Sequence, residues 1–269
     1  MVNGIYTIDA HCHIYPEKIV EKAVAGTDNF YGVESHCKGT VSDLLKVGAD
    51  AGIDHFLVQS VATTPKQVKS INEFIAREVA EKPQKLTGLG TLHPDSEDMA
   101  GDVAHIIELG LKGVKLHPDI QAFAIDDKRC LKIYELCEKH NLPILMHTGD
   151  NRYDYSNPNR LLPVLKAYEG MTVIGAHLGG YSIWQEACEA YCGIKNFYVD
   201  CSSSMPWLNK KETLEIIRSY GADRVLFGTD YPMWSPKAEI ESILSIGLDE
   251  NEILSILNIN AKKVFNLKN

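Results

Sequence analysis

Two histidines, His11 and His13, stand one residue apart in the stretch IDAHCHIYP, directly after an apolar run. Residues i and i+2 of a β-strand point to the same side, so both imidazoles can reach one ion while Cys12 between them faces away. Further polar residues close later apolar runs: His93, Lys115, His117, His147, His177 and Asp230. Each of these histidines alone could be an ordinary strand-end residue. A metal site requires a fold that brings several of them together.

The repeating pattern of the chain predicts such a fold. Eight short apolar runs occur, and most begin about 25 to 30 residues after the previous one, which is the length of one βα unit. The runs are residues 6–11, 54–61, 86–94, 111–118, 142–149, 171–180, 196–202 and 224–232. The first interval is longer, close to about 50 residues, so we expect extra structure in the loop after the first strand.

The segments between the runs have helical patterns. In the segment 66–82, apolar residues recur every third or fourth position, which predicts one buried stripe. The segment 209–221 closes on Gly221, a natural helix end. A further helix is predicted over 126–141, and closing helices are predicted over 235–247 and 249–267.

Together the elements predict an α/β protein. The apolar runs are continuous rather than alternating, as in parallel strands that helices cover. We predict that residues 1–269 form a single (β/α)₈ TIM barrel with extra C-terminal helices and an extended loop after the first strand. The alternative, an open doubly wound sheet, would require a GxGxxG turn at the start of a helix, and the sequence contains none.

The composition narrows the class of protein. The chain has 269 residues, of which 45% are apolar and 23% charged, and its net charge of -9 argues against nucleic acid or a membrane surface as partner. Its seven cysteines include no CxxC pair, which is typical of reduced thiols in a cytoplasmic protein. No apolar run reaches the roughly 20 residues of a membrane span, and the N-terminus has no signal-peptide pattern.

In a parallel barrel, all the polar strand-end residues lie at the C-terminal face, where barrel enzymes have their active sites. His11, His13, His147 and Asp230 would converge there from the first, fifth and eighth strands. Three imidazoles and one carboxylate suit one divalent ion, zinc first, and also tolerate manganese, iron, cobalt or nickel. Four such ligands leave a position for water, which is typical of a catalytic site.

The combination DAHCH, KLHP, HTG, HLGG and FGTDYP in this order resembles the amidohydrolase superfamily, over essentially the whole chain. It is most similar to the branch that contains aminocarboxymuconate semialdehyde decarboxylase. The resemblance implies that His11, His13 and His147 are metal ligands, and that Asp230 is both ligand and proton carrier. It also implies that His177 orients or polarises the substrate, or works as an acid or base in the decarboxylases.

Lys115 and His117 share one face of the fourth predicted strand. Many superfamily hydrolases bridge two metals with a carboxylated lysine on this strand, but one metal or none is usual in the branch that this chain resembles. We therefore expect a neutral or salt-bridged Lys115, paired with Asp9 or Asp230, or else facing substrate. His93 and His117 each precede a proline and are interpreted as substrate-facing or structural.

The predicted reaction is hydrolysis of an amide, ester or lactone by a metal-bound water. Asp230 would move the proton, and His177 would stabilise charge on a carbonyl oxygen. The alternative is non-oxidative decarboxylation, which needs a cation to hold the substrate carboxylate. Only Arg152, in the loop after the fifth strand, has a suitable place in the sequence. A barrel that binds metal or ligand without turnover is the third hypothesis.

The loops after the strands are expected to form the pocket wall. They carry aromatic residues, among them Trp207 and Trp234, which fit a small, partly apolar organic substrate. The long first loop, which includes NFYGVESHCKG, could act as a lid. A homodimer is compatible with barrels of this kind, although no residue in the sequence shows it.

Overall fold

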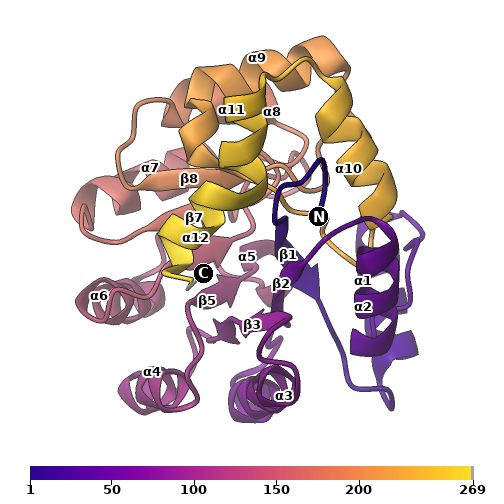
Figure 1. The fold of residues 1–269 in the computed structure, drawn as a ribbon. Helices are drawn as coiled ribbons and strands as arrows, with labels where there is room; N and C mark the ends of the chain where they lie inside the picture. The colour runs from indigo at the N-terminus through magenta and orange to yellow at the C-terminus, as the bar shows by residue number, and fades with distance from the viewer. Residues whose placement is uncertain (268–269) are drawn as a thin grey trace.

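A computed structural model of the protein describes residues 1–267. Its centre is a ring of parallel strands, and helices surround this ring (Figure 1). One sheet has the order β1-β2-β3 and the other has the order β4-β5-β6-β7-β8-β9. The described strands are β1 (Ile8–His13), β2 (His55–Gln59), β3 (Leu86–Gly88), β4 (Gly90–Thr91), β5 (Val114–Leu116), β6 (Ile144–Met146), β7 (Val173–Gly175), β8 (Phe197–Asp200) and β9 (Val225–Leu226). This is the predicted TIM barrel.

The run 86–94 forms two short strands, β3 and β4, where one was predicted. The backbone changes its hydrogen-bonding neighbour at this point. The Leu89 N–H donates to the Val58 carbonyl of β2, whereas the Gly90 N–H donates to the Gly113 carbonyl next to β5. The ring closes between β1 and the segment after β9. There the Ala10 N–H donates to the Phe227 carbonyl.

Helices follow the strands as predicted. They are α1 (Val20–Tyr31), α2 (Val41–Asp50), α3 (Val68–Glu81), α4 (Met99–Glu108), α5 (Pro118–Gln121), α6 (Leu131–Lys139), α7 (Pro158–Ala167), α8 (Trp184–Tyr191), α9 (Lys210–Tyr220), α10 (Pro236–Ser245), α11 (Glu250–Leu254) and α12 (Asn260–Phe265). A π-helical turn, η4 (Ser255–Ile259), joins α11 to α12, and the 3₁₀ turns are η1 (Pro65–Gln67), η2 (Lys128–Cys130) and η3 (Ala222–Arg224). None of the helices in residues 1–267 has the length and apolar composition that a membrane crossing requires.

Local sequence explains the ends of these helices. In α9, the Asn209 side chain caps the first turn, and the Glu212 carboxylate accepts a hydrogen bond from the Asn209 N–H, which completes a capping box. The helix ends before Gly221, as predicted. In α3, the stripe Val68, Phe74 and Ile75 is buried, which confirms the predicted inward face.

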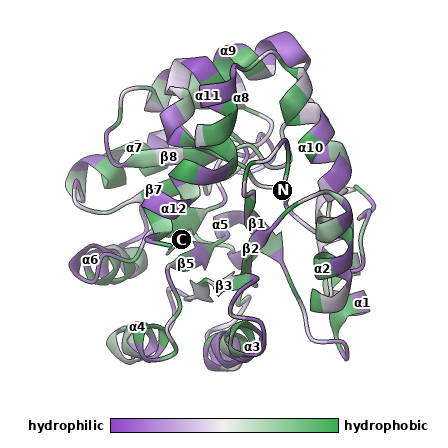
Figure 2. Cartoon of the chain, in the orientation of Figure 1, coloured by the Kyte–Doolittle hydropathy of each residue, from purple (hydrophilic) through white to green (hydrophobic). Residues whose placement is uncertain are grey.

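The core has two layers. The larger layer lies between strands and helices, and the smaller one fills the inside of the barrel with Leu57, Leu145 and Ile174. Hydrophobic residues accordingly concentrate on the strands and on the inner sides of the helices (Figure 2). Ala261 and Phe265 of α12 pack against the inner layer, so the closing helix covers the centre of the ring (Figure 1).

The long first interval contains α1 and α2, which confirms the expected extra structure after the first strand. Thr40 caps α2, since its hydroxyl accepts the Asp43 N–H. Gly48 of α2 lies against Phe56 of β2, where a Cβ would stand 2.2 Å from the ring. The insertion is therefore anchored to the barrel through α2, and α1 extends from it.

Candidate active site

Three predicted ligands meet at the C-terminal end of β1. His11 Nε2 lies 3.1 Å from His13 Nε2, and these two nitrogens lie 3.2 and 3.5 Å from Asp230 Oδ1. An ion about 2.1 Å from three ligand atoms holds those atoms about 3.0 to 3.4 Å apart. The distances and the donor set of two imidazoles and a carboxylate therefore fit a divalent metal ion.

His11 is held by a carboxylate that the sequence analysis did not single out. The His11 Nδ1–H donates to Asp200 Oδ2 at 2.9 Å, and both side chains are fully buried. The lone pair of His11 Nε2 therefore faces His13 and Asp230, which is the tautomer that a metal ligand needs. Asp200 closes β8 just as the histidines close their strands, so its place at a strand end was the available signal.

The backbone at His177 and Asp230 has an unusual conformation. Their φ angles are 61° and 57°, in the left-handed region that non-glycine residues rarely adopt. His177 lies two residues beyond the end of β7, and Asp230 lies four residues beyond the end of β9, each where the chain turns into a loop. Such local strain is common at functional sites, where the surrounding fold holds a side chain in a required direction.

His147 is not part of the group around His11. A chain of hydrogen bonds fixes its orientation: the His177 Nδ1–H donates to the Ser202 carbonyl at 3.1 Å, so His177 Nε2 accepts from His147 Nδ1 at 3.0 Å. The lone pair of His147 Nε2 then faces Asp119 Oδ2 at 3.6 Å, and this buried nitrogen has no hydrogen-bond partner among the described residues. The structure thus brings together three of the four predicted ligands.

His117, Asp119 and His147 form a second group with ligand-like spacing. The two imidazole rings stack with centroids 4.0 Å apart and planes within 7° of parallel. Ring lone pairs lie in the ring plane, so two stacked rings direct them along parallel lines rather than to a common point. This group therefore does not fit a metal ion.

Burial controls the charges of the site. It lowers the pKa of His11, His13, His117 and His147 well below the usual range, so these rings are neutral. It also lowers the pKa of His177 to about 4. Burial raises the pKa of Asp230 to about 7, against the opposing effects of the Ser203 hydrogen bond and of Lys115. An Asp230 carboxyl with this pKa can hold or release a proton near neutral pH.

Lys115 is fully buried at the floor of the site. Its Nζ lies 3.1 Å from His11 Nε2, and burial lowers the pKa of its ammonium to about 8. Among the described residues Lys115 forms an ion pair with neither Asp9 nor Asp230, the two partners predicted for it, and the Asp9 carboxylate accepts the Thr229 hydroxyl and the Thr229 N–H. Lys115 instead stands directly beside the candidate metal ligands.

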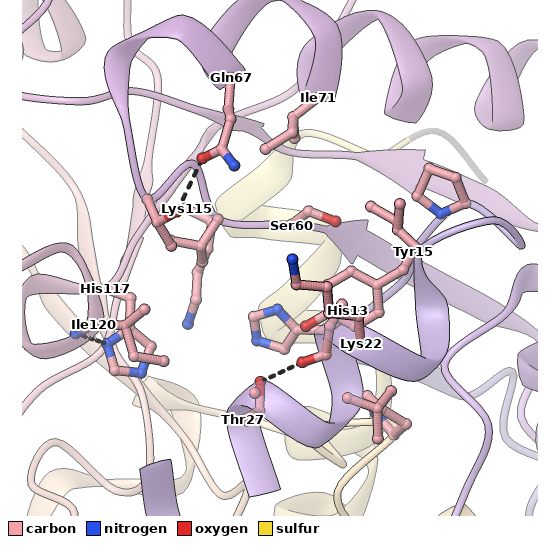
Figure 3. A pocket seen from close by; sticks show the side chains of 18 of the residues that line it. His13, Tyr15, Lys22, Thr27, Ser60, Gln67, Ile71, Lys115, His117 and Ile120 are labelled. Atoms are coloured by element: carbon pink, nitrogen blue, oxygen red, sulfur yellow. Dashed lines mark hydrogen bonds between the residues drawn. The ribbon is translucent and has the colours of Figure 1, made fainter. Parts of the chain in front are cut away.

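A cavity of about 820 Å³ opens over these groups. His13, Lys115 and His117 line its inner part, and Gln67 and Ile71 line the opposite side (Figure 3). Its outer part carries Lys18, Lys22 and Arg77. The lining is thus mixed, with apolar and basic groups and with the acidic residues Glu73 and Asp230.

The other residues that were predicted to bind substrate do not line the large cavity. His93 does not line this cavity, and its Nδ1 accepts the Asp95 N–H at 3.2 Å. Trp234 lines a small neighbouring cavity beside Asp230, whereas Trp207 is 50% exposed and touches Trp234 edge-on. Arg152 lies outside both cavities.

Arg152 holds a helix in place. Its guanidinium binds Asp150 through two hydrogen bonds of 2.9 and 2.7 Å, and its Nη1 donates to the Phe30 carbonyl at 2.6 Å. Phe30 and Tyr31 close α1, so Arg152 joins the loop after β6 to the helix of the first insertion. The sequence marked Tyr31 only as part of the stretch NFYGVESHCKG, and its hydroxyl enters the site.

Comparisons with known proteins agree with this fold. A family model described as amidohydrolase matches residues 8–267. A 2-amino-3-carboxymuconate-6-semialdehyde decarboxylase of Dictyostelium discoideum is 32% identical over 203 residues. That match covers 60% of this chain and 55% of the relative, so the chain spans about half the length of this curated relative.

Two solved structures share the fold. A TIM-barrel protein of Bordetella bronchiseptica has a TM-score of 0.82 at 22% identity, covering 97% of this chain and 99% of that chain. A dihydroxybenzoic acid decarboxylase of Polaromonas sp. JS666, with bound manganese and the inhibitor 2-nitroresorcinol, has a TM-score of 0.73 at 16% identity, covering 97% of each chain. At these identities, the likeness establishes the barrel alone.

Proposed function

Because the chain belongs to the amidohydrolase family, we propose that it is a metal-dependent, non-oxidative decarboxylase of a small aromatic or unsaturated carboxylic acid. The decarboxylase relative that is 32% identical supports this reaction over the hydrolysis that the sequence favoured. The manganese in a decarboxylase of the same fold supports a divalent ion, manganese or zinc.

The position of Lys115 carries the proposal. Decarboxylation needs a cation for the substrate carboxylate, and Arg152, the candidate from the sequence, is bound to Asp150 and Phe30. Lys115 Nζ, 3.1 Å from His11 Nε2, supplies that cation at the floor of the cavity. A buried ammonium attracts a carboxylate far more strongly than an exposed one, since water does not screen it.

In this proposal, His11, His13 and Asp230 would hold the metal, which would supply Lewis-acid polarisation of a substrate oxygen. Lys115 binds and orients the carboxylate. That His147 is a fourth metal ligand stays a prediction, and the metal content of a His147→Ala protein tests it.

Asp230 is the group that moves the proton in this proposal. The carboxyl of Asp230 gives its proton to the carbon that bears the carboxylate. The carbon–carbon bond then breaks, carbon dioxide leaves, and its bonding electrons restore the ring or the conjugated system of the product. Asp230 regains its proton from water. His177, fixed by the Ser202 carbonyl, orients the substrate beside it.

The test is release of carbon dioxide from a panel of hydroxybenzoates by protein loaded with manganese or zinc, with and without a chelator. The same panel includes lactones, esters and amides. Metal-dependent release of carbon dioxide is expected. Turnover of the lactones, esters or amides alone would overturn the proposal in favour of hydrolysis.

A matched pair of variants tests the role of Lys115. Lys115→Met keeps the length of the side chain and removes its charge, whereas Lys112→Met makes the same change at an exposed position. We expect Lys115→Met to lower kcat/KM for the acid by about 100-fold with the metal content unchanged, because a buried charge-assisted hydrogen bond contributes about 1.5 to 3 kcal/mol. Equal activity of the two variants would remove Lys115 from the mechanism.

A further inference from the structure

Tyr31 brings a phenol from outside the barrel into the site. It is the last residue of α1, and Gly32 ends the helix with a φ of 68°. The Tyr31 hydroxyl lies 2.7 Å from His117 Nε2 and 3.4 Å from His147 Nδ1. Tyr31 lines the large cavity and also the small one beside Asp230.

The hydrogen-bond geometry assigns the protons around this hydroxyl. The Ile120 N–H can only donate, and it donates to His117 Nδ1 at 3.2 Å. The neutral His117 ring therefore carries its proton on Nε2 and donates it to the Tyr31 oxygen.

His147, the second histidine near the Tyr31 hydroxyl, cannot accept its proton either. His147 Nδ1 is already the donor to His177 Nε2 at 3.0 Å, as the Ser202 carbonyl requires. It is thus not an acceptor for the phenol. Among residues 1–267, the Tyr31 O–H is left with no acceptor, although its oxygen accepts from His117.

We propose that Tyr31 is a catalytic residue that donates a hydrogen bond to a substrate oxygen on which negative charge develops, in the cavity above His11, His13 and Asp230. This inference rests on the proposed function and adds a residue from the insertion after β1 to the barrel's own groups. A donor that already points into the cavity need not reorganise during the reaction, which is how such donors stabilise a transition state.

The surroundings of Tyr31 fix its direction. Its ring packs edge-on against Tyr181 at 5.3 Å, and the Arg152 guanidinium lies over it at 5.2 Å. Tyr31→Phe retains these ring contacts and removes only the hydroxyl. Burial keeps the pKa of this phenol well above its usual value, so the group holds its proton at neutral pH.

The kinetic test compares Tyr31→Phe with Tyr153→Phe. Tyr153 also stacks near this helix end, on Phe30 at 5.6 Å, but lines neither cavity. On the acid that the wild-type protein decarboxylates, we expect Tyr31→Phe to lower kcat about 10- to 100-fold with KM changed less than about threefold. Tyr153→Phe should behave as wild type. An unchanged kcat in Tyr31→Phe overturns the proposal.

A second measurement separates this inference from the proposed function. If no acid is turned over, the proposed function fails, and binding of 2-nitroresorcinol to metal-loaded wild type and Tyr31→Phe decides the role of the hydroxyl. About tenfold weaker binding by Tyr31→Phe is expected. Equal behaviour of the two proteins, absence of binding included, overturns the inference.

The proton assignment has its own readout in the free protein. Nitrogen-15 NMR of the histidine rings, assigned with His117→Gln, should show His117 protonated on Nε2 and not on Nδ1. A proton on Nδ1 would make Tyr31 a donor to His117, and the inference would fail regardless of activity.

Discussion

At the scale of single residues, the site depends on hydrogen bonds that choose one tautomer for each histidine. Asp200 fixes His11, and the Ser202 carbonyl fixes His177. These partners lie at strand ends on β8 or just beyond it, next to the proposed ligands. Partners of this kind are expected to tune metal affinity without touching the metal.

Asp200→Asn tests whether the hydrogen-bond partner of His11 tunes metal affinity. An amide cannot provide the same charged acceptor for the His11 Nδ1–H, so we expect metal affinity to fall about 10- to 100-fold with the fold retained. Competition with a chelator of known affinity measures the change. Asp223→Asn, at an exposed position in η3, is the control. Unchanged affinity in Asp200→Asn would show that His11 needs no such partner.

Glu239 makes stability depend on pH. This residue of α10 is buried, its Oε2 has no hydrogen-bond partner among the described residues, and burial raises its pKa to about 8. The unfolded chain releases this proton near pH 4.5, whereas the folded chain keeps it until about pH 8. Stability from this group is therefore complete below pH 4.5 and is lost as the pH rises to about 8.

In Glu239→Gln, nothing at this position titrates. We expect the decline in the free energy of unfolding between pH 5 and 8 to be smaller than in wild type, by on the order of a few kcal/mol. Urea unfolding of the chelator-treated proteins at several pH values measures it. Parallel pH profiles for the two proteins would exclude Glu239 as the cause.

At the scale of elements, α1 belongs to the site although it is not part of the barrel. Its C-terminal end is held by Arg152, which also stacks on Phe30 at 4.9 Å. The side chain of Asp150, to which Arg152 is bound, is fully buried. These contacts hold the end of the helix whose last residue, Tyr31, lines the cavity. That the first loop acts as a lid stays a prediction.

Arg152→Lys tests this contact. A lysine keeps a positive charge beside Asp150 but cannot also reach the Phe30 carbonyl with a second fixed donor. Hydrogen exchange of the amides in α1 should become roughly 10-fold faster, as expected for the loss of one charge-assisted hydrogen bond. Arg160→Lys, at a similar pair of contacts to Asp126 and Asp154, should leave α1 unchanged. Equal exchange in both variants would mean that Arg152 does not hold the helix.

At the scale of the whole molecule, the two ends of the barrel have separate roles. The proposed ligands and the cavity lie at the C-terminal ends of the strands, while Phe265 of α12 is buried against the residues inside the ring. Stability and chemistry are commonly divided in this way between the two faces of such barrels. The predicted homodimer, the cytoplasmic location and the limits of the domain, residues 1–269, stay predictions.

Phe265→Ala tests the division. Loss of a buried aromatic ring should lower the free energy of unfolding by about 3 to 5 kcal/mol, whereas metal stoichiometry and kcat of the folded protein should not change. Ile259→Ala, at a residue that is 46% exposed, is the control. A loss of metal binding in folded Phe265→Ala would show that the two ends are coupled.

Much of the fold and part of the site follow from local pattern. Helix ends such as Gly221 and the stripe of α3 depend on neighbouring residues, so periodicity predicts them. The break between β3 and β4 was not predicted, because it arises from a change of hydrogen-bonding partner between distant strands. For the same reason, the sequence could not show that Arg152 is occupied by α1.

The sequence by itself determined that His11 and His13 face one way, because the two-residue period of a strand is a local property. It also placed Asp230 at the same end of the barrel, because parallel strands end on one face. Only the tertiary structure decided which side chains meet there: Asp200 behind His11, Lys115 beside it, His147 turned toward Asp119, and Tyr31 above. Side-chain direction at a strand end depends on contacts between residues far apart in the chain, and no local pattern contains them.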